Sequence, residues 1–170
     1  MSKKISVVPL CEKNEKDFYQ IVEEYLPDSN LEKVKMYAGL FPNAFLVLLC
    51  ENEVIGVAFG WDRKIEFPED DSFVLNGIAV HSDWQKNGYG KQLLKAFEAA
   101  AEEYGESVVS LGSAGGDVEK FYIDCGYLPM EYKYWENGGP VVEKSFEGSE
   151  EYYSYVRKNK DGFVVMYKNL

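Results

Sequence analysis

The sequence predicts one α/β domain with a mixed sheet. The chain has 170 residues, of which 46% are hydrophobic, enough for one well-buried core and too few for two domains to be the default. Apolar segments at residues 45–50 and 54–61 flank a polar turn, which predicts an antiparallel hairpin. Between residues 72 and 111 a strand, a glycine loop, a helix and a further strand follow one another, which predicts a βαβ unit with two parallel strands. We therefore expect a single domain over residues 1–170.

The N-terminal part is predicted to hold a strand and two helices. Residues 5–10 form an apolar strand-like segment. Residues 14–25 have apolar side chains at helical spacing, namely Phe18, Ile21, Val22 and Tyr25. A second helix is expected from Leu31 to about Leu40, because Asn30 is a favourable N-cap residue.

The central part is predicted to hold a strand and a longer amphipathic helix. Residues 72–80 are apolar apart from Asn76-Gly77, and a glycine inside a strand indicates a bulge or a close approach of backbone. The helix after the glycine loop ends at Gly105. Its apolar face consists of Leu93, Leu94, Phe97, Ala100, Ala101 and Tyr104.

The C-terminal part is predicted to hold three strands and one short helix. A strand at residues 107–111 is followed by a flexible turn at residues 112–116. A two-turn helix ending at Gly126 has an apolar face at i, i+3, i+4 and i+7, namely Val118, Phe121, Tyr122 and Cys125. Two further strands are expected at residues 127–135 and 163–167. The segment between them, residues 136–162, is polar and rich in tyrosine.

Composition and charge argue against several classes of protein. The three cysteines are far apart and lack Cys-x-x-Cys spacing, which supports neither a disulfide framework nor a thiolate zinc site, and we expect no metal. The net charge of −11 argues against a nucleic-acid partner. No apolar run is long enough for a membrane span or a signal peptide, so we expect a cytoplasmic protein without a membrane partner.

The segment from Gln85 to Lys91 is the strongest functional signal, because it joins an apolar strand to an amphipathic helix. Gly88 and Gly90 allow successive backbone N–H groups to point inward, and the helix adds unpaired donors and the positive end of its dipole. Lys86 and Lys91 add positive charge in an acidic protein. The segment therefore predicts a phosphate-binding site.

Two well-known phosphate loops do not fit the spacing. A Walker loop needs a glycine at the position of Gln85 and a hydroxyl residue at the position of Gln92. A dinucleotide fingerprint needs a third glycine where Leu93 stands, and an acidic residue after the next strand, where the chain has Leu111-Gly112.

The remaining pattern resembles the GNAT superfamily of acyl-CoA-dependent N-acyltransferases. The chain has Gln-x-x-Gly-x-Gly after a strand that ends in Ile-Ala-Val, and Phe121 to Tyr127 is similar to the family's short helix that ends in Gly-Tyr. The resemblance covers roughly residues 73–127, and residues 164–170 are similar to the family's last strand. It implies a mixed, mostly antiparallel twisted sheet that is splayed between two central parallel strands and flanked by helices.

The resemblance also implies acetyl-CoA as co-substrate. Backbone N–H groups of the loop would hold the pyrophosphate, namely those of Gln85, Lys86, Asn87, Gly88, Tyr89, Gly90 and Lys91. The end of the preceding strand, Ile78, Ala79 and Val80, would pair with the amides of the pantetheine arm. One of these N–H groups could polarise the thioester carbonyl.

Tyr122 occupies the position where the family often places a proton donor for the leaving thiolate, although it could also only pack in the core. The residue that acts as general base is not identified, because the family's usual glutamate positions correspond to Asn76 and Val74 in this chain. The amine could bind already neutral, or lose its proton through water to one of three carboxylates, Glu66, Asp71 or Glu131.

Two other reactive side chains are given no catalytic role. His81 is expected in a solvated loop position, and Cys125 has no histidine or basic residue beside it, so we expect direct transfer and no covalent enzyme intermediate. The acidic loop at residues 66–71 and the aromatic tail could together form a cation-accepting site, or the acids could be solvated surface and the aromatics core packing. The aromatic tail consists of Tyr132, Tyr134, Trp135, Tyr152, Tyr153 and Tyr155.

The predicted function is transfer of an acetyl group from acetyl-CoA to a primary amine of a small molecule or peptide, in a ternary complex. Two alternatives are a non-catalytic acyl-CoA-binding module and a protein-interaction domain with a vestigial pocket. A homodimer is compatible with the aromatic strands of the tail.

Overall fold

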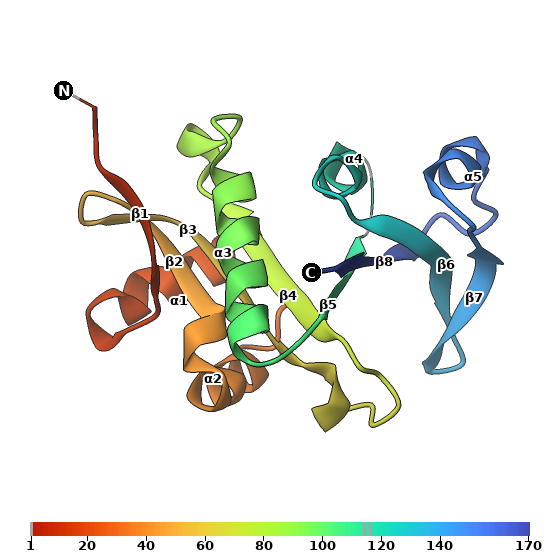
Figure 1. Ribbon diagram of the computed structural model, residues 1–170, viewed down its shortest axis with the longest axis horizontal. Coiled ribbons are helices and arrows are strands. Elements are labelled where there is room, and N and C mark those ends of the chain that lie inside the picture. Colours follow the sequence, from red (N-terminus) through yellow and green to blue (C-terminus); the bar gives the residue numbers. More distant parts are fainter. Residues whose placement is uncertain (1, 114, 116) are drawn as a thin grey trace. The chain divides into compact units, whose positions relative to one another are not determined.

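The computed structural model describes residues 2–113, 115 and 117–170. It divides into two compact units, the first ending at Ser107 and the second beginning at Val108. Each unit is described by itself (Figure 1). The single domain over residues 1–170 stays a prediction, as do the pairing and splaying of the two predicted parallel strands, since these belong to different units.

The first unit is an antiparallel sheet with helices on both faces. Its strands have the order β1-β2-β3-β4. They are β1 (Ile5–Pro9), β2 (Phe45–Cys50), β3 (Glu53–Asp62) and β4 (Phe73–Val80). The helices are α1 (Glu15–Tyr25), α2 (Leu31–Leu40) and α3 (Tyr89–Glu103). These elements agree with the sequence prediction, and the Asn30 side chain caps α2 by accepting from Lys33 N–H at 3.1 Å.

Successive residues of β3 point alternately to the two faces of this sheet. Val57, Phe59 and Trp61 belong to the core formed with α1 and α2. Gly56 and Gly60 point the other way, where a Cβ atom would lie 3.1 Å from Leu93 and 2.6 Å from Phe97 of α3. Accordingly α3 covers one face and α1 and α2 the other (Figure 1). The glycines allow α3, which begins at the predicted phosphate-binding segment, to approach the sheet closely.

The predicted bulge in β4 is confirmed. Phe59 pairs with Gly77 and Gly60 pairs with Leu75, so Asn76 is left over between them, and it is exposed. Gly77 is required there, because a Cβ atom would lie 2.4 Å from the Phe59 ring. The bulge therefore depends on glycines on both strands.

Replacing Gly60 with alanine should destabilise the first unit by about 1–3 kcal/mol, the usual range for overpacking. The new Cβ would lie 1.9 Å from the Val74 carbonyl oxygen, which is backbone and cannot turn away as a side chain could. Urea unfolding would measure the change. Gly39→Ala is the control, because a Cβ at this helical position meets nothing within 4 Å. An equal loss in both variants would contradict the packing argument.

The second unit is also an antiparallel sheet, with strand order β5-β8-β6-β7. Its strands are β5 (Val108–Ser113), β6 (Leu128–Glu136), β7 (Gly139–Ser145) and β8 (Phe163–Asn169). Its helices are α4 (Asp117–Asp124) and α5 (Ser149–Ser154).

The structure corrects the prediction for the tail. Strand β7 and helix α5 lie within residues 136–162, which were predicted to be a polar segment between two strands. The missed signal is Asn137-Gly138, which has positive φ angles of 50° and 83° and forms a hairpin turn between β6 and β7. Of the predicted turn at residues 112–116, Gly112 and Ser113 belong to β5, whereas 114 and 116 lie outside the described residues.

The buried face of α4 also differs from the prediction. Val118 is 52% exposed, whereas Glu119 is 1% exposed and buried together with Tyr122. Glu119 can be buried because Arg157 and Tyr152 bind its carboxylate. The apolar spacing alone could not reveal this, since these partners come from a distant part of the sequence.

Candidate functional site

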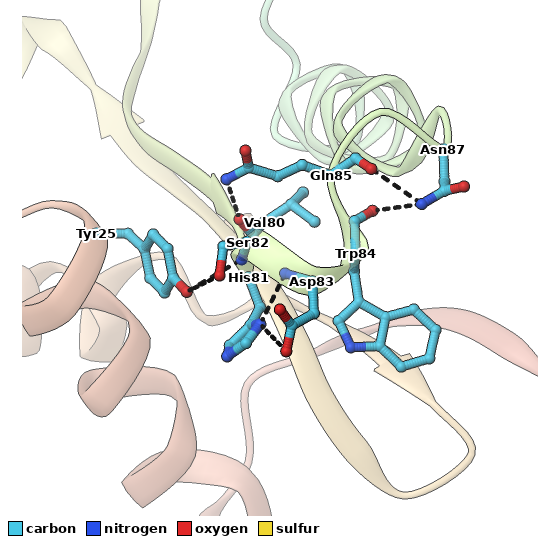
Figure 2. A network of polar contacts seen from close by, with 8 residues as sticks. All are labelled: Tyr25, Val80, His81, Ser82, Asp83, Trp84, Gln85 and Asn87. Atoms are coloured by element: carbon cyan, nitrogen blue, oxygen red, sulfur yellow. Dashed lines mark hydrogen bonds and ion pairs between the residues drawn. The ribbon is translucent and has the colours of Figure 1, made fainter.

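Side-chain amides organise the loop between β4 and α3. The Gln85 side chain donates from Nε2 to the Val80 carbonyl at 2.8 Å (Figure 2). The Asn87 side chain donates from Nδ2 to the carbonyls of Trp84, at 3.1 Å, and Gln85, at 3.0 Å (Figure 2). Three carbonyl groups of this region are thus hydrogen-bonded within the loop itself.

The first turn of α3 offers free backbone donors. The first intrahelical bond runs from Gln92 N–H to the Gly88 carbonyl at 3.2 Å. The four N–H groups from Gly88 to Lys91 consequently have no intrahelical acceptor. The helix has 15 residues, so its dipole adds positive potential at this end. Lys86 and Lys91 are exposed and form no ion pair with the carboxylates that the structure describes. These features suit an anionic group such as a diphosphate.

The backbone of the loop takes a conformation that favours glycine at Gly88, where φ is 80°. A Cβ atom there would meet nothing within 4 Å, so the conformation and not the packing requires glycine. Lys86 also has a positive φ, of 61°, which is uncommon for a residue with a side chain. The sequence prediction assigned the unusual backbone to the glycines alone and missed Lys86.

The start of the loop is attached to the end of α1 through Tyr25. Its hydroxyl accepts from Ser82 N–H at 3.0 Å and donates to Ser82 Oγ at 3.2 Å (Figure 2). The Tyr25 ring also packs against the His81 ring, with 5.7 Å between centroids. The sequence analysis placed Tyr25 only on the apolar face of α1. Helical spacing does not predict a contact with Ser82, which is 57 positions away.

His81 has a local role in the same region. Its Nδ1 accepts from Asp83 N–H at 3.2 Å and lies 3.8 Å from the Asp83 carboxylate (Figure 2). This use of the imidazole in a turn agrees with the prediction that His81 lies in a loop, and its lack of a catalytic role stays a prediction.

The strand end Ile78, Ala79 and Val80 leads directly into this loop. These residues pair with Ala58, Val57 and Gly56 of β3 and are partly buried. The Val80 carbonyl already accepts the Gln85 amide. A carbonyl oxygen has two lone pairs, so an extended ligand can donate to Val80 while the Gln85 amide stays in place.

Tyr122 lies in the second unit and is 6% exposed. Its ring packs edge-on against Phe121, with 5.3 Å between centroids, and Tyr127, with 5.8 Å. No hydrogen bond joins its hydroxyl to another described residue. Burial, with a smaller effect from Cys125, raises the pKa of Tyr122 above its usual value. The phenol is therefore protonated at neutral pH and free to donate to a ligand.

The three carboxylates considered as bases are all in ion pairs. Glu66 accepts from Tyr37 at 3.0 Å and from Lys33. Burial opposes its ionisation, but these hydrogen bonds outweigh that effect and lower the pKa of Glu66. Asp71 pairs with Lys64 at 2.8 Å, and Glu131 pairs with Lys133 at 3.0 Å. The lowered pKa makes Glu66 a poor base.

Asp70 of the acidic loop also forms an ion pair, with Arg63 at 3.3 Å. This agrees with the alternative of a solvated surface for residues 66–71. Across the described residues, no group of three or more His, Cys, Asp or Glu side chains is arranged to hold a metal ion. None of the helices described here has the length and apolar character of a membrane span.

The strand–loop–helix geometry defines an α/β protein whose helix α3 begins with backbone donors that have no intrahelical acceptor. The family described as acetyltransferase (GNAT) domain matches residues 42–129, just over half of the chain. The chain therefore belongs to the GNAT acetyltransferase family.

One curated relative resembles part of the chain. The tRNA(Met) cytidine acetyltransferase TmcA of Aeropyrum pernix is 40% identical over 59 residues, which is 35% of this chain and 8% of that protein. The chain thus spans a small part of this curated relative.

Solved structures resemble the chain over almost its whole length. Ard1 from Thermoplasma volcanium has a TM-score of 0.71 at 14% identity, covering 98% of this chain and 97% of that one. Arabidopsis thaliana Naa50, solved in complex with the bisubstrate analogue CoA-Ac-MVNAL, has a TM-score of 0.68 at 13% identity, covering 98% and 99%. These similarities confirm the predicted fold class.

Proposed function

We propose that the protein is an N-acetyltransferase that transfers the acetyl group of acetyl-CoA to a primary amine. The observation that carries the proposal is the start of α3. The four N–H groups from Gly88 to Lys91 lack intrahelical acceptors there, and Gly88 has a left-handed backbone conformation. Such an arrangement fits the diphosphate of coenzyme A. Its position in a chain of the GNAT family supports acetyl-CoA as the acyl donor.

The residues of the loop are assigned to binding. The N–H groups of residues 85–91 would hold the diphosphate, and Lys86 and Lys91 would add attraction. Backbone groups of Ile78, Ala79 and Val80 would pair with the pantetheine amides. Acetyl-CoA, when bound, supplies an activated acyl group as a thioester.

Tyr122 is assigned as the proton donor. In a direct transfer, the amine nitrogen forms a bond to the acetyl carbon while the bond between that carbon and sulfur breaks. The Tyr122 hydroxyl gives its proton to the departing sulfur, and the new amide nitrogen loses a proton to solvent. The tyrosinate then takes up a proton from solvent after release. The hydroxyl is protonated at neutral pH and has no hydrogen-bond partner among the described residues, and both features support this role.

The acceptor amine is proposed to bind in its neutral form, because the three candidate carboxylates are in ion pairs and Asn76 cannot take up a proton. A small-molecule amine and a peptide amine both fit the proposal. The peptide-containing analogue bound to Naa50 supports a peptide. A cytoplasmic location and a homodimer stay predictions.

A thermal-shift experiment tests the proposal. Millimolar acetyl-CoA should raise the melting temperature, because a ligand at 100 times its Kd stabilises a protein by about 2.7 kcal/mol. S-acetylpantetheine, which lacks the diphosphate, is the matched control and should give a much smaller shift. Thiol release should then be measured across a panel of peptide and small-molecule amines.

The outcomes separate the alternatives. No shift with acetyl-CoA would contradict the proposed function and favour a protein-interaction domain. A clear shift without thiol release for any amine would favour a non-catalytic acyl-CoA-binding module, which the asparagine at position 76 would suit.

A further inference from the structure

A buried carboxylate on α4 is not used in the proposed reaction. Glu119 is 1% exposed, and its Oε2 accepts from Arg157 Nη2 at 2.5 Å and from the Tyr152 hydroxyl. Its other oxygen, Oε1, is buried and has no hydrogen-bond partner among the residues described. Burying a carboxylate costs free energy of folding unless the charge is paired and hydrogen-bonded. The contacts with Arg157 and Tyr152 must therefore keep a defined geometry.

Arg157 connects this carboxylate to strand β6. Its guanidinium lies over the Tyr132 ring, 4.8 Å from the centroid. The Tyr132 hydroxyl in turn donates to the Asn159 carbonyl at 2.5 Å and accepts from Gly162 N–H at 3.0 Å. A continuous set of directional contacts therefore joins α4 to the segment that follows α5 and to the sheet of the second unit.

Glu119 and Tyr122 are the two buried residues of α4. They are three positions apart, so they lie on the same face of the helix, about one turn from each other. With eight residues, α4 is too short to be stable without tertiary contacts. Its rotation about its own axis, and with it the direction of the Tyr122 hydroxyl, depends on what its buried face binds.

We propose that Glu119 is a positioning residue for Tyr122. The bonds from Arg157 and Tyr152 fix the rotation of α4, which apolar packing alone would leave less sharply defined. An apolar residue of similar size would often stabilise a protein as well as a buried ion pair does. The carboxylate is therefore better explained by the orientation it imposes than by stability. The inference rests on the proposed role of Tyr122.

Glu119→Gln is the main test, because it keeps the shape of the side chain and removes the charge that holds Arg157. We expect kcat to fall at least tenfold, while the Kd for acetyl-CoA changes less than twofold. In the Tyr122→Phe background, the same substitution should change kcat less than twofold, because its effect passes through the Tyr122 hydroxyl.

Glu143→Gln is the matched control. The Glu143 carboxylate accepts from the Tyr155 hydroxyl and from the N–H groups of Lys158 and Asn159, but it lies on β7 and not on α4. The Glu143→Gln substitution should lower the melting temperature without lowering kcat. A readout without acetyl-CoA is the NMR signal of Tyr122 carrying ¹³C at Cζ, which should move in Glu119→Gln and stay in place in Glu143→Gln.

Several results would overturn the inference. An unchanged kcat in Glu119→Gln would contradict it, and so would equal losses of kcat in Glu119→Gln and Glu143→Gln. It would also be contradicted if the effects of Glu119→Gln and Tyr122→Phe on kcat multiply in the double variant. If Glu119→Gln does not fold, Arg157→Lys keeps a positive charge beside Glu119 but removes the planar fork, and it should still lower kcat. A wild-type protein without turnover would refute the proposed function, whereas the NMR comparison would still test the positioning role.

Discussion

Replacing Tyr122 with phenylalanine should lower kcat at least tenfold and leave the Kd for acetyl-CoA nearly unchanged. General acid catalysis typically contributes a factor of about 10²–10⁴, and the change removes only the hydroxyl group. The ring is buried against Phe121 and Tyr127, and those packing contacts remain in the variant. Steady-state kinetics combined with calorimetry of acetyl-CoA binding would measure both quantities.

The same residue predicts a feature of the pH profile. Burial raises the pKa of Tyr122, so the wild-type phenol should stay protonated up to at least about pH 10, the ordinary pKa of tyrosine. No loss of kcat from its ionisation is expected below that pH. Full activity of Tyr122→Phe would remove Tyr122 from the mechanism and leave it a packing residue. Tyr127→Phe is the control, since it changes a neighbouring buried tyrosine of the same unit.

Replacing Gly88 with valine should weaken acetyl-CoA binding about tenfold or more. Gly88 has a φ of 80°, and a residue with a Cβ in this conformation is disfavoured by roughly 1–2 kcal/mol, with β-branched residues affected most. The backbone would relax toward negative φ and turn the N–H groups of the loop away from their common direction. A valine side chain would also fill space that is open in the protein and that the diphosphate would need.

Gly105→Val separates the loss of binding from a general loss of stability. Gly105 ends the same helix with a similar φ of 85°, and a Cβ there also meets nothing within 4 Å. Both variants should lower the free energy of unfolding by similar amounts in urea titrations, whereas only Gly88→Val should weaken acetyl-CoA binding in calorimetry. Equal affinities in the two variants would mean that the start of α3 does not bind the diphosphate.

Local features of the sequence were sufficient to predict most helices and strands, and the phosphate-binding role of residues 85–91 stays a prediction. The Asn30 cap, the bulge at Asn76 and the ends of α3 follow from the conformational preferences of single residues and from hydrophobic spacing. The order of strand, glycine loop and helix was informative for the same reason, because its backbone donors are set by neighbours in the chain. The hairpin of β6 and β7 could also have been predicted from Asn137-Gly138.

Contacts between distant residues were beyond such reasoning. Helical spacing placed Tyr25 on an apolar face, but only the folded chain brings its hydroxyl to Ser82. Glu119 belongs to a residue type that is normally exposed, and its burial depends on Arg157, 38 residues later. The ion pairs of the candidate bases likewise come from the fold.

The sequence by itself determined the elements, the glycine-dependent backbone of the loop and membership of the family, because these depend on short-range stereochemistry and on motif spacing. Only the tertiary structure decided which polar groups are paired, which remain free to donate and which charge is buried. Those properties depend on side chains that the chain brings together from far apart, and local patterns carry no information about such partners.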